Sequence, residues 1–139
     1  MARKERLILD SFAIIGFLEN EPFAGRIQDL LIQGREQSIL LYLHAIHLGE
    51  LYYITMREQG QAMADKVYAR VRAFPMTFVD HIDEKLLLAA ARIKARYPVS
   101  YADSFAAALA LIHGCPLATG DPEFGKLEQE GVISVLWLT

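Results

Sequence analysis

The chain has 139 residues, a length that suits one compact domain, and 53% of them are hydrophobic. That composition excludes an intrinsically disordered chain and provides for one substantial core. No apolar run reaches the length of a bilayer span, and the apolar run 7–9 near the basic N-terminus is cut short by Asp10. We therefore expect a cytoplasmic protein without a membrane segment, forming one domain over residues 1–139.

The formal net charge of −3 at pH 7 is unusual for a protein that binds nucleic acid. Without the four candidate site acids described below it becomes +1, so an acidic total does not exclude a nucleic-acid substrate. Cys115 is the single cysteine, which excludes an internal disulfide. Because it lies in an apolar stretch with no activating base nearby, we expect a buried spectator.

Short apolar runs alternate with longer helical periods along the chain. In chain order the pattern predicts a strand at 6–9, helices at 12–18 and 24–33, a strand at 38–43, helices at 45–59 and 62–73, a strand at 76–79, helices at 84–97 and 101–113, a strand at 116–118, a helix at 124–130 and a strand at 134–137. Continuously apolar strands are typical of a parallel sheet covered on both faces. The predicted fold is therefore a three-layer α/β/α sandwich with right-handed crossovers.

Three aspartates lie where a predicted strand or loop turns into a helix. Asp10 follows the first strand, Asp121 follows the fourth, and Asp103 opens a helix. Each also has a simpler interpretation as part of a helix start: Asp10 as an N-cap, Asp103 in a capping box with Ser100, and Asp121 as an N-cap before Pro122. In open α/β sheets, however, ligands bind at the carboxyl ends of the strands, where these acids would meet.

The fourth acid, Glu50, lies inside the predicted helix 45–59. That helix is apolar on more than one face, so we expect it to be largely buried. A buried carboxylate is costly without a partner. Two interpretations stay open: metal or catalytic use beside the aspartates, and a buried ion pair with Arg57.

Four carboxylates at one sheet edge would repel one another and raise one another's pKa, and a divalent cation removes that repulsion. An all-oxygen ligand set favours Mg²⁺ or Mn²⁺ over Zn²⁺. A rival zinc site at His44, His47 and Glu50 is disfavoured, because steps of three residues drift around a helix and spread the side chains apart. The sequence therefore points to an acidic magnesium or manganese centre, which suits phosphodiester hydrolysis.

Four segments of the chain resemble the motifs of the PIN-domain ribonucleases. They are 7–11 (LILDS), 47–53 (HLGELYY), 99–110 (VSYADSFAAALA) and 116–124 (PLATGDPEF). Their order and the size of the chain resemble the small VapC-type toxins of prokaryotic toxin–antitoxin pairs, and the resemblance spans almost the whole sequence. One mild departure is Ser104, where the family usually has alanine.

The resemblance implies a PIN-like five-stranded parallel sheet of order 3-2-1-4-5. It also implies a Mg²⁺- or Mn²⁺-dependent endoribonuclease that cleaves RNA with metal-activated water. A cognate antitoxin protein and a homodimer are the expected partners. The residues implied to be both catalytic and metal-binding are Asp10, Glu50, Asp103 and Asp121. Ser11 and Thr119 match positions of small hydroxyl residues beside the metal, whereas we interpret Glu123 as an ordinary first-turn acid.

The alternative function is a non-catalytic PIN-like module that binds RNA or protein, which the loss of a site acid would favour. A haloacid-dehalogenase-type phosphatase is disfavoured because Phe12 stands where that chemistry wants a second aspartate. A receiver-like signalling domain is disfavoured because Lys126 lies in the wrong context for a phosphate-contacting lysine.

Two further groups of residues have a functional and an ordinary interpretation. Basic residues that would meet substrate phosphates are equally explained as solvated surface: Arg3, Lys4, Arg6, Arg92, Lys94 and Arg96. An apolar stripe along the helix 62–73 would face a second protomer or an antitoxin, but a core-facing stripe is the simpler interpretation: Met63, Val67, Val71 and Phe74.

Overall fold

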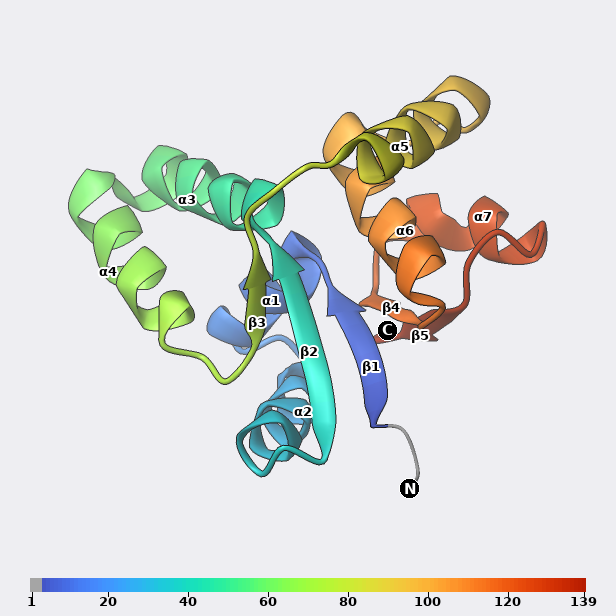
Figure 1. Cartoon of the computed structure of the whole chain (residues 1–139). Coiled ribbons are helices and arrows are strands. Elements are labelled where there is room, and N and C mark those ends of the chain that lie inside the picture. Colours follow the sequence, from blue (N-terminus) through green and yellow to red (C-terminus); the bar gives the residue numbers. More distant parts are fainter. Residues whose placement is uncertain (1–3) are drawn as a thin grey trace.

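A computed structural model describes residues 4–139, so Arg3 lies outside the described residues. Five strands form one parallel sheet in the order β3-β2-β1-β4-β5 (Figure 1). The strands are β1 (Glu5–Leu9), β2 (Ile39–His44), β3 (Thr77–Val79), β4 (Leu117–Thr119) and β5 (Val135–Trp137). The predicted α/β sandwich and its strand order are confirmed.

Helices form the crossovers between the strands and cover both faces of the sheet (Figure 1). They are α1 (Ser11–Leu18), α2 (Ala24–Arg35), α3 (Ala45–Gln59), α4 (Gln61–Arg72), α5 (Glu84–Arg96), α6 (Tyr101–His113) and α7 (Gly125–Gln129). The predicted bounds agree with these helices and strands to within two residues. The last helix is preceded by a 3₁₀ turn, η1 (Pro122–Phe124), which starts with Pro122, a residue favoured at the first helical position.

Alternate residues of the central strand β1 belong to two different cores. Leu7 and Leu9 pack with α1 and α2 on one face, whereas Ile8 packs with α5 and α6 on the other. Ile8 is also in register with Tyr42 of β2 and Leu117 of β4. Since all strands run in the same direction, the residues that follow β1 and β4 meet at one edge of the sheet.

The apolar stripe of α4 belongs mainly to the core. Val71 is fully buried, and Val67 and Phe74 pack against the core cluster that also contains Leu7 and Leu9. Met63 alone is substantially exposed, at 38%. The core interpretation of this stripe therefore holds for three of its four residues.

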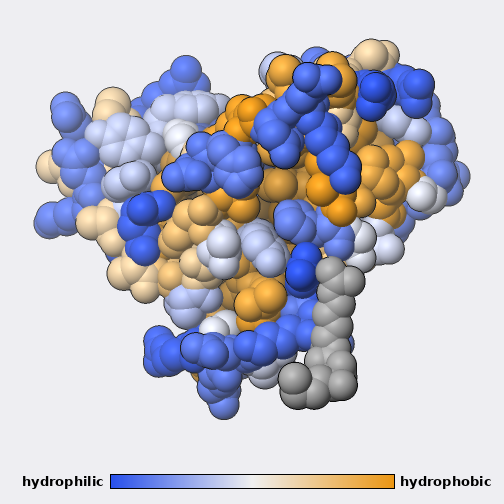
Figure 2. Space-filling model, in the orientation of Figure 1, coloured by the Kyte–Doolittle hydropathy of each residue, from blue (hydrophilic) through white to orange (hydrophobic). Residues whose placement is uncertain are grey.

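Hydrophobic residues gather on the surface over the part of the molecule where α5 and α6 lie (Figure 2). The large exposed hydrophobic side chains of this region are Ile82, Leu87, Leu88, Tyr101 and Leu111. Within residues 4–139, none of the helices combines the length and the hydropathy needed to cross a membrane.

Gly16 of α1 is required by close packing. A Cβ at this position would overlap the ring of Phe23, which is itself stacked on Phe12 with 5.6 Å between ring centroids. We expect Gly16→Ala to lower the free energy of unfolding by about 1–3 kcal/mol, because the ring has little room to retreat. Urea unfolding followed by circular dichroism measures this change.

Gly25→Ala is the matched control. A Cβ on Gly25 of α2 would meet nothing within 4 Å. Alanine is the better helix former, so this variant should be up to about 1 kcal/mol more stable than the wild type. Equal effects of the two substitutions would contradict the packing argument.

Candidate metal centre

Asp10 ends β1 and caps α1. Its side chain is 1% exposed, and Oδ1 accepts a hydrogen bond of 3.0 Å from the backbone N–H of Ala13. The helix-cap interpretation is therefore correct, but it does not exclude a functional one. The hydroxyl of Thr119, at the end of β4, also hydrogen-bonds to the Asp10 carboxylate. Asp10 is thus fixed between the ends of two neighbouring strands.

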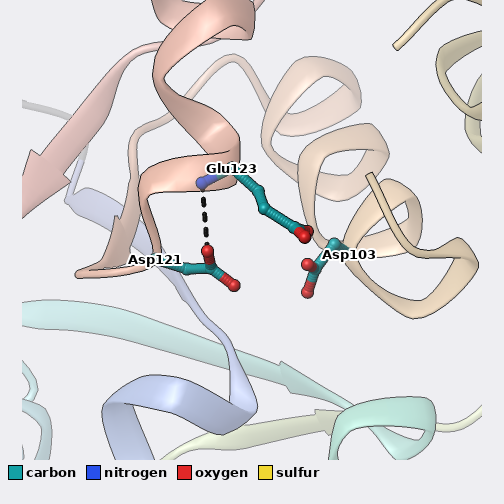
Figure 3. A group of neighbouring side chains, drawn as sticks. All are labelled: Asp103, Asp121 and Glu123. Carbon is teal, nitrogen blue, oxygen red and sulfur yellow. Dashed lines mark hydrogen bonds between the residues drawn. The ribbon is translucent and has the colours of Figure 1, made fainter. Parts of the chain in front are cut away.

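Asp103, Asp121 and Glu123 each bring a carboxylate oxygen into a group whose members lie within 4.8 Å of one another. Asp121 Oδ1 accepts a 3.0 Å hydrogen bond from the backbone N–H of Glu123 (Figure 3). The backbone N–H of Asp121 in turn donates to Thr119 Oγ1 at 3.1 Å. The turn at Pro122 directs the side chain of Glu123 towards Asp103 (Figure 3). The interpretation of Glu123 as an ordinary first-turn acid missed this placement.

The Asp103 carboxylate points to the site and is not used as a helix cap. Ser100 caps α6, because its Oγ accepts a 3.1 Å hydrogen bond from the backbone N–H of Asp103. The side chain of Asp103 turns towards Asp121 and Glu123 (Figure 3). Only the serine half of the predicted capping box forms within the described residues.

Glu50 is half-buried, so the prediction that its helix is largely buried was only partly correct. Helix α3 leaves Tyr53 43% exposed to solvent. Within residues 4–139 no ion pair joins Glu50 to Arg57, whose guanidinium instead lies 4.9 Å from the centre of the Tyr53 ring. Ser11 Oγ donates a 3.0 Å hydrogen bond to Glu50 Oε1. Since Ser11 directly follows Asp10, Glu50 is directed to the acidic site.

The carboxylates share one electrostatic environment. Burial raises the pKa of Asp10 to about 7, and the charges of Asp121 and Glu50 add to the rise. Burial also raises the pKa of Asp103, reinforced by a hydrogen bond with Glu123 and by the charges of the other acids. Burial and the charge of Asp121 raise the pKa of Glu50, against the lowering effect of the Ser11 hydrogen bond. All four acids predicted from the sequence therefore influence one another, and Glu123 joins them.

A divalent cation fits this donor set. Its members are carboxylate oxygens accompanied by the hydroxyls of Ser11 and Thr119, which suit Mg²⁺ or Mn²⁺. Asp103, Asp121 and Glu123 have the spacing to share one ion, whereas Asp10 and Glu50 lie outside that tight group. Bound positive charge would remove the repulsion that raises the pKa values.

The rival zinc site does not form. His44 hydrogen-bonds through Nε2 to the backbone carbonyl of His81 at 3.0 Å. His47 hydrogen-bonds through Nε2 to the backbone carbonyl of Ala102 at 2.8 Å. Neither ring belongs to a potential metal group with Glu50 among residues 4–139. The structure therefore agrees with an all-oxygen site.

Within residues 4–139, four of the remaining sequence candidates have environments of their own away from the acids: Lys4, Arg6, Lys94 and Cys115. Lys4 and Arg6 lie at the start of β1, at the opposite end of the sheet from the acids. The ammonium group of Lys94 is hydrogen-bonded to the carbonyl of Val99 at 2.8 Å. Cys115 is half-buried, and burial raises the pKa of its thiol, which suits an unreactive spectator.

The fold and the site together define an α/β protein with an acidic centre at the carboxyl edge of a parallel sheet. The model of the PIN domain family matches residues 7–130, which is most of the chain. The protein therefore belongs to the PIN-domain family.

Several solved structures share this fold. The chain is similar to the VapBC2 complex of Rickettsia felis bound to a DNA fragment from its promoter, with a TM-score of 0.74, 12% identity, and coverage of 94% of this chain and 97% of that one. It is similar to DNA-bound VapBC of Salmonella typhimurium, with a TM-score of 0.72, 17% identity and coverage of 97% and 99%. VapC20 of Mycobacterium tuberculosis, described as a sarcin-ricin loop cleaving toxin, has a TM-score of 0.65, 16% identity and coverage of 86% and 93%. No curated protein matches the sequence.

The raised pKa values predict an unusual pH dependence of stability. Between about pH 4 and about pH 7 the folded chain holds protons on Asp10 and Asp103 that the unfolded chain has released. Because the folded state binds more protons, metal-free stability should fall as pH rises through this window. Urea unfolding in EDTA at several pH values measures the trend.

Millimolar Mg²⁺ should flatten this profile, because an ion that binds the ionised carboxylates stabilises the folded state at the high-pH end. The substitution Asp103→Asn should flatten it without metal, because one repelling charge is removed. A metal-free stability that increases from pH 5 to pH 7 would contradict the electrostatic description.

Proposed function

We propose that this protein is a metal-dependent endoribonuclease and the toxin of a VapBC-type toxin–antitoxin pair, with residues 1–139 acting as one nuclease domain. The observation that supports this best is the meeting of Asp10, Glu50, Asp103 and Asp121 at one sheet edge. No basic side chain among residues 4–139 forms an ion pair with these carboxylates, so their charge is left for a cation to balance. Membership of the PIN-domain family supports nuclease chemistry at this position.

In the proposed reaction the acids have two roles. A bound Mg²⁺ or Mn²⁺ would neutralise charge on the scissile phosphodiester and make water a better nucleophile. Asp103, Asp121 and Glu123 have the spacing to hold the ion. To Asp10 and Glu50, which are hydrogen-bonded to the hydroxyls of Thr119 and Ser11, we assign the orientation of the attacking water and the acceptance of its proton.

The proposal extends to partners. The structural neighbours include VapBC complexes from two organisms, which supports a cognate antitoxin protein as partner. A neighbour described as a sarcin-ricin loop cleaving toxin supports RNA as the substrate class. We propose a homodimer acting in the cytoplasm, where such a substrate would be met.

Replacement of the central acids tests the proposal. We expect Asp10→Asn and Asp103→Asn each to lower the rate of RNA cleavage by about 100-fold or more, because each removes negative charge needed at the reacting centre. Both variants should remain folded and be no less stable than the wild type in EDTA, since burial and repulsion disfavour the ionised forms. A cleavage assay on labelled RNA with and without Mn²⁺ measures the effect.

Asp80→Asn is the matched control. Asp80 directly follows β3, yet its side chain is 87% exposed and outside the acidic centre. Its loss should leave cleavage unchanged. Full activity of both central variants, or cleavage by the wild type in EDTA, would contradict the metal-dependent nuclease. RNA binding without cleavage would favour the non-catalytic module.

Expression in a bacterial host tests the toxin part of the proposal separately. The wild-type chain should arrest growth, because cleavage of essential RNA stops protein synthesis, and co-expression of the cognate antitoxin should restore it. The Asp103→Asn chain, expressed to the same level, should not arrest growth. Equal arrest by both chains would show that toxicity does not arise from this site.

A further inference from the structure

His47 forms a polar connection between the two helices that carry Glu50 and Asp103. Its ring is fully buried, and Nε2 lies 2.8 Å from the backbone carbonyl oxygen of Ala102. Since a carbonyl only accepts, Nε2 carries the proton and donates it. His47 lies almost one helical turn before Glu50 in α3, and Ala102 immediately precedes Asp103 in α6. The hydrogen bond therefore joins the turn of α3 that carries Glu50 to the backbone next to Asp103 in α6.

This histidine is a poor choice for stability alone. Nδ1 of His47 is buried and has no hydrogen-bond partner within the described residues. An unsatisfied buried acceptor is unfavourable, and a leucine of similar size would avoid it. Burial lowers the pKa of His47 to about 4, so the ring is neutral near pH 7 and offers no charge to the acids. What the ring does provide is one directional bond.

An aromatic contact beside this junction lacks the directionality of the hydrogen bond. The ring of His44, which caps α3, lies 6.1 Å from the ring of Phe105 in α6 at an angle of 34°. Such a contact tolerates small shifts, whereas a hydrogen bond to a fixed carbonyl restricts both distance and angle. A divalent ion with near-ideal geometry requires a ligand such as Asp103 to be held with that restriction, and the neighbouring Glu50 to keep its place beside the ligands.

We propose that His47 is a positioning residue of the metal centre: its hydrogen bond to the Ala102 carbonyl fixes Glu50 relative to Asp103. This inference rests on the proposed metal site. It assigns to the ring neither a metal bond nor a proton-transfer step.

Titration calorimetry of the full chain with MnCl₂ tests the role, together with urea unfolding in EDTA. His47→Leu keeps the bulk and removes the donor. It should weaken Mn²⁺ binding by about tenfold or more, while the metal-free unfolding midpoint stays unchanged or rises. His47→Gln, which retains a side-chain N–H, should bind within about threefold of the wild type. Replacement of a residue with a purely structural role would lower the Mn²⁺ affinity and the metal-free unfolding midpoint together.

Thr55→Val is the matched control on the same helix. Thr55 is 7% exposed and lies about two turns beyond His47 in α3. Its Mn²⁺ affinity should equal that of the wild type. Wild-type affinity in His47→Leu would overturn the inference, and so would failure of that variant to fold, because the ring would then be needed for the fold itself. Affinity of His47→Gln as weak as that of His47→Leu would overturn it as well.

The outcomes separate this inference from the proposed function. Absence of Mn²⁺ binding in the wild type would contradict both the role of His47 and the proposed metal-dependent function. A wild type that binds Mn²⁺ but leaves RNA intact would contradict the ribonuclease alone. A wild type that binds Mn²⁺ and cleaves RNA, beside a His47→Leu variant with the same affinity, would contradict the role of His47 alone.

Discussion

Repulsion among carboxylates at the carboxyl edge of the sheet is the interaction around which this structure is organised. The acids would move apart if their side chains could rotate into solvent. Asp10 cannot do so, because it is buried and bonded to the N–H of Ala13. Asp121 is tied through its carboxylate to the N–H of Glu123 and through its own N–H to Thr119. Backbone groups at element ends thus hold charges that would otherwise separate.

The helix starts at this edge therefore have two roles, since the residues that begin the helices also hold the carboxylates of the site. Helices α1 and α6 both begin at this edge, and the positive ends of their dipoles favour nearby negative charge. That favourable field does not cancel the effects of burial and repulsion, since the pKa values of Asp10 and Asp103 are still raised. Capping and metal binding are therefore compatible roles for one carboxylate, and a bound cation would supply the positive charge that the helix ends cannot.

Much of the fold was predictable because strong local signals agreed with one another. Continuous apolar runs such as 6–9 and 38–43 predicted buried parallel strands. The aspartates that follow the first and fourth strands predicted at which edge of the sheet the acidic site lies. The environment of Glu50 was harder to predict, because apolar residues on several faces of a helix do not tell which face is covered. Tyr53 remains exposed, and Arg57 turns to that ring instead of forming the ion pair that was the alternative interpretation of Glu50.

Other features depend on tertiary geometry that the sequence does not display. Glu123 has the usual form of a first-turn acid, and only the 3₁₀ turn at Pro122 brings it towards Asp103. His47 was weighed only as a zinc ligand, because its acceptor, the Ala102 carbonyl, lies 55 residues away in the chain. Backbone carbonyls carry no sequence signal, so contacts of this kind escape pattern-based prediction.

The most direct test of the central idea, that the acids form a divalent-metal site, is anomalous diffraction from crystals grown with Mn²⁺. The expected result is a manganese peak among Asp103, Asp121 and Glu123, with carboxylate oxygens about 2.1 Å from the ion. Well-ordered carboxylates without a peak at millimolar Mn²⁺, or a peak located elsewhere on the protein, would contradict it.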